Sequence, residues 1–285
     1  MPNHTILQLT ARTVDMSQYS KLFGTARIPT KTGCKMQVDP DSRHIVVVRR
    51  GQFYWFDALD SQDRPAFTEH ALLKNLSAIV QDADKVPRNQ VAQSALGVLS
   101  TERRATWAHY RKLLMDQHEG NRNALDVLDK ALFVVCLDDV VTDSATDMCN
   151  NMLSGTYKLE KGVQVGTCTN RYYDKLQIIV AANGAAGINF EHSGVDGHTV
   201  LRYVADVYTE LILLFAKTIN SQATTLFKAR LSPWAKGAGA KKGKPEVDEE
   251  REEIDTEPKK LYVHGLMSSC AGTLNRSLQR VGHDA

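Results

Sequence analysis

The sequence lacks paired cysteines, a strong excess of one charge and any long apolar run, and each absence removes a class of protein. The five cysteines among 285 residues are odd in number and form no CxxC pair, which argues against a disulfide framework and indicates reduced thiols. A formal net charge of +2 argues against a dedicated nucleic-acid-binding protein. The longest strongly apolar helical stretch, around 211–216, is far shorter than the roughly 20 residues that cross a bilayer, so we do not expect membrane insertion.

Targeting signals are also scarce. Residues 1–12 lack the basic start and the long apolar core of a secretory signal, although Arg12 and its Thr and Ser neighbours leave organelle targeting open. The final residues, His283-Asp284-Ala285, are not a peroxisomal address. We therefore expect an intracellular protein, and the sequence does not separate the cytoplasmic, mitochondrial and peroxisomal compartments.

What is present is enough apolar sequence for a sizeable core. With 42% hydrophobic and 24% charged residues, the chain suits one large domain or two small ones. Residues 44–57 predict a β-hairpin, because a β-branched run and an aromatic run flank the turn-forming residues 49–51. Apolar spacing predicts an amphipathic helix over 66–80.

The middle of the chain predicts a strand followed by two helices. Residues 97–99 indicate a short buried strand, and Ser100 or Thr101 is expected to cap the next helix, since a side-chain oxygen there can accept a hydrogen bond from a free amide. Asn121 marks a further start. The apolar pattern from 124 to 137 then predicts one continuous helix, closed by two aspartates.

A second hairpin is predicted before the last long helix. Residues 176–182 indicate a strand, and Asn183-Gly184 predicts a type I′ turn, in which both central residues need positive φ. Residues 185–190 form the expected return strand, and apolar periodicity predicts a helix over 199–220.

The return strand ends at the most informative stretch of the chain, Glu191-His192-Ser193-Gly194-Val195-Asp196-Gly197. An imidazole, with an ordinary pKa of about 6.5, can take a proton from a hydroxyl or thiol near neutral pH. A general base must also lie on a rigid element beside a cavity, with its ring fixed by a second group. His192 with Asp196 could meet this requirement, although a lone histidine at a strand end is more often structural.

Seven blocks in order resemble the carnitine/choline acyltransferase family, and together they span about residues 16–210. They are Met16-Ser17-Gln18-Tyr19 with Arg27-Ile28-Pro29; Gly51-Gln52-Phe53-Tyr54 with Asp57; the segment 99–107; Asn121-Arg122; Ala131-Leu132-Phe133-Val134-Val135-Cys136-Leu137-Asp138; Asn170-Arg171-Tyr172-Tyr173-Asp174-Lys175; and residues 189–197. Within this family the chain is most similar to fungal carnitine acetyltransferases.

The resemblance implies an α/β, chloramphenicol-acetyltransferase-like fold, with a mixed sheet and flanking helices. It also implies reversible transfer of a short acyl group between coenzyme A and carnitine. These two molecules are the expected small-molecule partners, with coenzyme A or acetyl-CoA as co-substrate, no bound cofactor and no nucleic acid.

The same resemblance assigns roles to single residues. His192 matches the catalytic histidine, which would deprotonate the carnitine hydroxyl or the coenzyme A thiol without a covalent acyl-enzyme. Asp196 would hold the polar network around this base, or alternatively cap the following helix. Glu191 is expected to make a loop hydrogen bond. Arg171, Tyr172 and Asp174 are interpreted as scaffold, and we expect no zinc site at His198, because no other metal-ligand spacing accompanies it.

The resemblance is partial, and we expect about one half of the two-domain family fold. The sequence is divided into a divergent segment 1–14, a partial acyltransferase-like domain 15–234, a charged flexible loop or linker 235–260 and a divergent tail 261–285. The family's coenzyme A and carnitine contacts have no counterpart, so residues that bind these substrates stay unassigned. The alternative is a truncated, catalytically inactive fragment that acts at most as a binding or association module, since exposed apolar surface would favour self-association.

Overall fold

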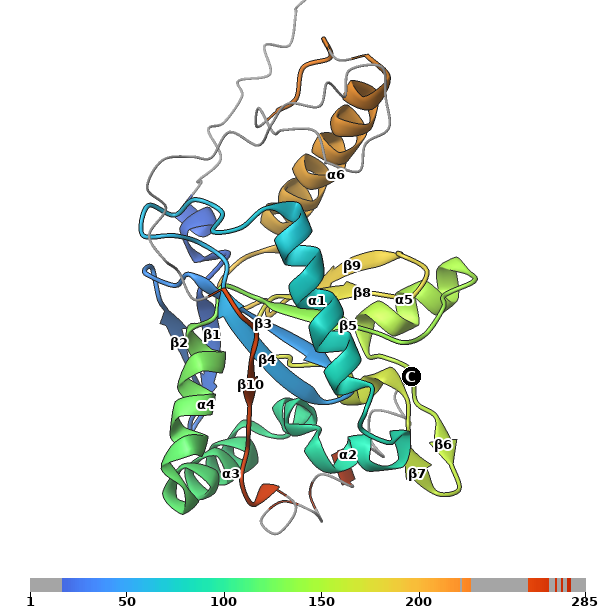
Figure 1. Ribbon diagram of the computed structural model, residues 1–285. Helices are drawn as coiled ribbons and strands as arrows, with labels where there is room; N and C mark the ends of the chain where they lie inside the picture. The colour runs from blue at the N-terminus through green and yellow to red at the C-terminus, as the bar shows by residue number, and fades with distance from the viewer. Residues whose placement is uncertain are drawn as a thin grey trace, which may run out of the picture.

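The computed structural model describes residues 17–220, 222–226 and 256–266, together with 270, 273, 276 and 277. At its centre is a six-stranded mixed sheet in the order β10-β4-β3-β5-β8-β9 (Figure 1). Its strands are β3 (His44–Arg49), β4 (Gln52–Asp57), β5 (Val134–Leu137), β8 (Gln177–Val180), β9 (Ala186–Asn189) and β10 (Lys259–Leu261). Two further pairs lie outside this sheet: β1 (Thr25–Pro29) with β2 (Cys34–Val38), and β6 (Leu159–Glu160) with β7 (Val163–Gln164).

The helices fall before, between and after these strands. They are α1 (Glu69–Ala83), α2 (Val91–Ser94), α3 (Arg104–Gln117), α4 (Glu119–Lys130), α5 (Ala145–Leu153) and α6 (Gly197–Ile219), with short 3-10 helices η1 (Ser17–Lys21), η2 (Arg88–Gln90), η3 (Leu96–Thr101) and η4 (Thr167–Asn170). None of the helices in the described ranges is long and apolar enough to span a bilayer.

Strand β3 shows how the sheet is covered on both faces. It pairs in parallel with β5, which pairs in parallel with β8, and such parallel strands are usually buried on both sides. Because side chains alternate along a strand, Val47 packs with Ile79 of α1, whereas Val46 and Val48 belong to the core that contains Trp107 of α3. The predicted α/β arrangement of a mixed sheet with flanking helices is therefore present.

The predicted hairpin at 44–57 is confirmed as β3 and β4, with Arg49 opposite Gln52. The two residues of its turn, Arg50 and Gly51, have φ angles of 47° and 66°. Positive φ at both positions is the signature of a type I′ turn, whose twist matches that of the flanking strands. The predicted helix at 66–80 is likewise confirmed as α1.

The second hairpin is confirmed as β8 and β9, but its predicted turn type is wrong. The Ala181 amide donates to the Ala185 carbonyl at 2.8 Å, which closes a three-residue loop. In this loop only Gly184 has positive φ, at 82°. A three-residue loop needs a single left-handed residue, usually glycine, so the Asn-Gly pair does not form the two-residue turn.

The predicted strand at 97–99 is wrong, because these residues form part of η3. A Cβ on Gly97 would lie 1.9 Å from the backbone carbonyl oxygen of Arg171, so this glycine allows two backbones to approach without strand pairing. The predicted capping by Ser100 or Thr101 is also wrong. Their hydroxyls instead donate to carbonyls within η3, at 2.5 and 2.7 Å, and the next helix begins only at Arg104.

The single helix predicted over 124–137 is wrong as well. Helix α4 ends at Lys130, and the apolar run that follows becomes the central strand β5. A short apolar run fits a buried strand as well as a buried helix, and periodicity alone does not distinguish them. Here the β-branched Val134 and Val135 pair in parallel with β3 and β8, and Val134 is buried while Val135 is half-buried.

The predicted helix at 199–220 is confirmed as α6, which extends away from the sheet in Figure 1. Only Thr199, Val200 and Glu210 of this helix are buried. A row of large apolar side chains is exposed along it, namely Leu201, Val204, Val207, Tyr208, Leu211, Ile212, Phe215 and Ile219. This surface is called the α6 apolar face below.

Two of the segments predicted from the sequence, the divergent segment 1–14 and the charged loop 235–260, lie wholly or mostly outside the residues that the structure describes. The segment 1–14 and residues 235–255 lie outside the described residues. Residues 259–261 form β10, which pairs antiparallel with β4, and Leu266 and Cys270 of the tail are buried in the larger core.

Candidate functional site

The histidine motif forms the turn between β9 and α6. His192 follows the strand end by three residues, and its side chain is exposed to solvent. Its ring lies 5.4 Å from that of Phe190, measured between centroids, with the planes tilted by 32°. The position gives the imidazole free access to a molecule outside the sheet, while the strand and the helix hold both ends of the turn.

Glu191, directly before this histidine, organises the turn. One carboxylate oxygen accepts from the Ser193 amide at 2.7 Å, and the other accepts from the Ser193 hydroxyl at 3.0 Å. The side chain also pairs with Arg27 of β1 at 3.0 Å and is only 12% exposed. These contacts agree with the expected loop hydrogen bond.

Asp196 is the N-cap of α6. Its carboxylate accepts from the Thr199 amide at 3.0 Å and from the Gln18 side chain at 3.0 Å. The Asp196 amide donates to the same Gln18 at 2.8 Å. The backbone hydrogen bond from Thr199, followed by that from Gln18, holds the pKa of this carboxyl below its usual range. The capping interpretation is therefore correct, while a supporting role beside His192 stays a prediction.

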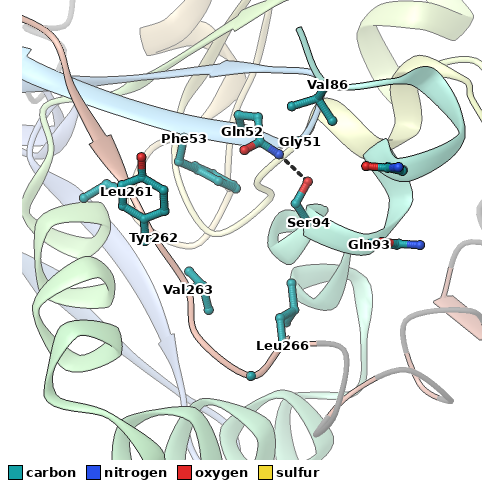
Figure 2. Close-up of a pocket in the computed structure, with 12 residues that line it drawn as sticks. Gly51, Gln52, Phe53, Val86, Gln93, Ser94, Leu261, Tyr262, Val263 and Leu266 are labelled. Carbon is teal, nitrogen blue, oxygen red and sulfur yellow. Dashed lines mark hydrogen bonds between the residues drawn. The ribbon is translucent and has the colours of Figure 1, made fainter. Parts of the chain in front are cut away.

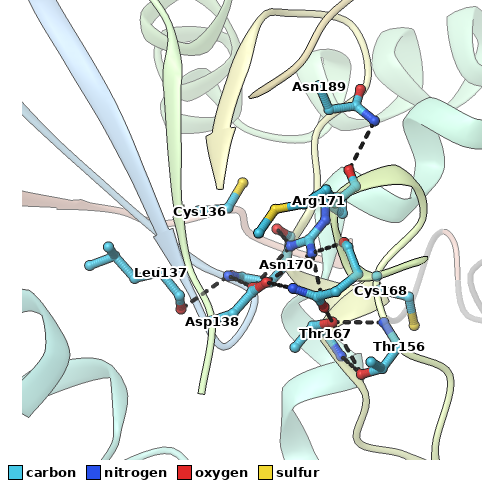
Figure 3. A network of polar contacts seen from close by, with 12 residues as sticks. Cys136, Leu137, Asp138, Thr156, Thr167, Cys168, Asn170, Arg171 and Asn189 are labelled. Carbon is cyan, nitrogen blue, oxygen red and sulfur yellow. Dashed lines mark hydrogen bonds and ion pairs between the residues drawn. The ribbon is translucent and has the colours of Figure 1, made fainter. Parts of the chain in front are cut away.

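A buried polar network lies between β5 and the segment before β8 (Figure 3). Arg171 binds Asp138 with two hydrogen bonds of 2.9 and 2.8 Å, and neither side chain is exposed. Asn151 and Asn170 donate to the same carboxylate at 2.8 and 3.0 Å. Both oxygens of a fully buried anion are thus satisfied by fixed donors.

The neighbouring motif residues are buried and paired too. Asp174 pairs with Arg104 at 2.8 Å and accepts from the Trp107 indole at 2.7 Å, and Tyr172 is fully buried. These contacts agree with the interpretation of Arg171, Tyr172 and Asp174 as scaffold, which stays a prediction. Arg104 and Trp107 come from α3, which the sequence pattern did not connect to this motif.

Lys175, to which the sequence pattern gave no role, is a buried amine. Its Nζ donates to the Thr25 carbonyl at 3.0 Å and to the Asp129 carbonyl at 2.8 Å. Burial lowers the pKa of this lysine to about 7, although the charges of Asp129 and Asp39 act in the opposite direction. The side chain ties β1 to the end of α4.

This lysine predicts a specific pH dependence of stability. Between pH 7 and about 10, the unfolded chain holds a proton on Lys175 that the folded chain has released, so the free energy of unfolding rises with pH. From pH 7 to 9 the wild type should gain about 2 kcal/mol relative to Lys175→Met, because the limiting slope is about 1.4 kcal/mol per pH unit. Urea unfolding at both pH values measures this difference.

The exposed Lys112 provides the control for that experiment, since its side chain is 69% exposed. The difference between wild type and Lys112→Met should stay the same at pH 7 and pH 9. A difference between wild type and Lys175→Met that does not change with pH would contradict the depressed pKa.

A pocket of about 480 Å³ opens on another part of the molecule, between α2, the start of β4 and the chain after β10 (Figure 2). Its lining is apolar or carries neutral polar groups, from Gly51, Gln52, Phe53, Val86, Gln90, Gln93, Ser94, Leu261, Tyr262, Val263, Gly265 and Leu266. The lining contains neither His192 nor any ionisable carboxylate, amine or imidazole. It therefore offers no group for proton transfer near neutral pH, and the histidine turn is the better candidate for catalysis.

A metal centre has no support in the described parts of the chain. They hold no group of three or more His, Cys, Asp or Glu side chains placed to bind a metal ion. His198 lies in the first turn of α6 with its side chain exposed.

Comparisons with known proteins agree with the motif. Residues 2–276 match the profile of the choline/carnitine O-acyltransferase family. The chain is 44% identical over 230 residues to a putative mitochondrial carnitine O-acetyltransferase of Saccharomyces cerevisiae. This alignment covers 75% of this chain and 33% of the yeast protein. It is 34% identical over 213 residues to human mitochondrial carnitine O-palmitoyltransferase 2, and this alignment covers 74% of this chain and 30% of the human protein. The aligned part thus spans about a third of these relatives' length. The chain belongs to the choline/carnitine O-acyltransferase family.

Proposed function

We propose that this chain takes part in the reversible transfer of an acyl group between coenzyme A and the hydroxyl of carnitine, with His192 as the general base. The imidazole takes the proton of the carnitine hydroxyl, and the oxygen attacks the acyl carbonyl carbon. The bond from this carbon to the coenzyme A sulfur then breaks, and the leaving thiolate receives the proton from the imidazolium. The reverse reaction uses the same proton in the opposite direction.

One observation carries this proposal. In a chain of this family, an exposed imidazole stands at the end of a sheet strand, in a turn fixed by Glu191 on one side and by the Asp196 cap on the other. Such fixation is what a general base requires, because misplacement of the reacting groups by about 1 Å can cost about a hundredfold in rate. Asp196 would contribute by fixing the helix that follows the base.

The acetyl group is the proposed acyl group. The yeast relative at 44% identity is named a carnitine O-acetyltransferase, whereas the human palmitoyltransferase is 34% identical. Both names include a mitochondrial location, which we propose for this chain as well. We further propose that the mixed sheet is part of a chloramphenicol-acetyltransferase-like fold.

The test is a thiol-release assay on the purified chain, with acetyl-CoA and L-carnitine as substrates. We expect release of the coenzyme A thiol that depends on carnitine and that is lost in His192→Gln. Absence of carnitine-dependent release in the folded wild type would overturn the proposal and favour the inactive-fragment alternative. Octanoyl-CoA and palmitoyl-CoA in the same assay test the preference for the acetyl group.

The expected self-association through exposed apolar surface stays a prediction, and we propose the α6 apolar face as the surface that carries it. Leu211 and Phe215 are 58% and 64% exposed and lie one helical turn apart. Because contiguous exposed apolar surface favours association, the wild type should form oligomers whose share rises with concentration. Sedimentation equilibrium should show this behaviour reduced in the double variant Leu211→Glu/Phe215→Glu, and a wild type that stays monomeric would contradict it.

A further inference from the structure

The histidine turn is held from outside by one cation. Arg27 of β1 places a guanidinium nitrogen 3.0 Å from the Glu191 carboxylate, and this carboxylate accepts both hydrogen bonds from Ser193, the residue after His192. The Glu191 side chain is 12% exposed and that of Arg27 33%, so solvent screens the pair only in part. Removal of the cation would leave a mostly buried carboxylate without its charge partner.

Arg27 is itself tied to the rigid interior through its backbone. Its amide donates to the Asp174 carbonyl at 2.9 Å, and its carbonyl accepts from the Arg104 side chain at 3.0 Å. The Arg104 side chain in turn pairs with the Asp174 carboxylate at 2.8 Å, and that carboxylate also accepts from the buried Trp107 indole. A continuous set of polar contacts therefore runs from the core under α3, through β1, to Glu191.

We propose that Arg27 is a positioning residue for His192, acting through Glu191 to hold the turn in the conformation that presents the imidazole. This inference rests on the proposed function only for its effect on catalysis. That Arg27 holds the conformation of the turn is a separate statement, and it can be measured without substrate. The hydrogen bonds from Ser193 to the Glu191 carboxylate are charge-assisted and therefore strong. They should weaken when Arg27 no longer holds that carboxylate in place.

The Ser193 amide gives the direct readout, because it donates to Glu191. In Arg27→Met its hydrogen exchange should become about tenfold faster or more, while exchange in β8 and β5 stays unchanged. Arg27→Lys should restore part of the protection, since an ammonium can still pair with the carboxylate. Unchanged Ser193 exchange in a folded Arg27→Met would overturn the proposal.

Cys34 provides a matched control, because its sulfur accepts from the Arg27 Nε at 2.9 Å and is not part of the ion pair with Glu191. Cys34→Ser should leave Ser193 exchange within about twofold of the wild type, and an effect equal to that of Arg27→Met would show that the packing of β1 and β2, not the ion pair, is responsible. If Arg27→Met fails to fold, Arg27→Gln removes the same charge with a polar side chain and leaves the Glu191 acceptor in place. It should accelerate Ser193 exchange in the same way, and the proposal fails if it does not.

Catalysis supplies the second readout. In the thiol-release assay, Arg27→Met should lower kcat by about tenfold to a hundredfold and leave the KM for carnitine within about twofold, because it moves the base and not a substrate contact. A rise in KM with kcat unchanged would overturn the positioning role. If the wild type shows no turnover, the proposed function fails while Ser193 exchange still decides whether Arg27 holds the turn.

Discussion

Replacement of His192 by glutamine is expected to lower the rate of acyl transfer by about 10² to 10⁴-fold, the usual contribution of a general base. Glutamine keeps a polar group of similar length and can still accept a hydrogen bond, but it cannot take a proton. Because the side chain is exposed, the substitution leaves the hydrogen bonds of the turn in place and removes the titratable group together with its ring contact to Phe190. Thiol release from acetyl-CoA in the presence of L-carnitine measures the loss.

His198 is the matched control for this experiment. Its side chain is also exposed, and it lies in the first turn of α6, on the other side of the Asp196 cap. His198→Gln should keep the rate within about twofold, the range expected when a surface substitution leaves the reacting groups in place. Retention of the wild-type rate in His192→Gln, or an equal loss in both variants, would show that the imidazole of His192 is not the base.

The parts of the fold that could be predicted are those that short-range patterns specify. The hairpin of β3 and β4 follows from its two apolar runs and from the turn at Arg50-Gly51, and α1 follows from its apolar spacing. The run that becomes β5 could not be assigned, because its strand form depends on parallel pairing with β3 and β8, which are distant in sequence. Gly97 was misread for the same reason, since the carbonyl that approaches it belongs to Arg171.

The candidate site shows the same division. The motif identified His192, and the local hydrogen bonds of Glu191 and the cap at Asp196 could be foreseen, because their partners lie within three residues. The ion pair with Arg27 and the two carbonyls bound by Lys175 could not, since a charge in a sequence does not name its partner. Arg27, Lys175 and Glu191 all lie in the family blocks, but the blocks do not indicate which residue contacts which.

The buried ion pair of Asp138 and Arg171 carries the largest predicted effect on stability. The pair joins the end of β5 to the segment before β8, and so supports the hairpin of β8 and β9 that leads to the histidine turn. Asp138→Ala should lower the free energy of unfolding by about 3–5 kcal/mol, because it leaves the Arg171 guanidinium buried without a counter-charge. Urea denaturation of wild type and variant measures the change.

Two further variants separate the charge from the cavity that Asp138→Ala leaves. The double variant Asp138→Ala/Arg171→Met should be less destabilised than the sum of the two single changes, because no buried charge is then left unpaired. Asp206→Ala removes a comparable pair on the surface of α6, where Arg202 is 66% exposed, and should change stability little. Strictly additive losses at Asp138 and Arg171 would contradict the ion pair as the source of the stability and would assign it to packing alone.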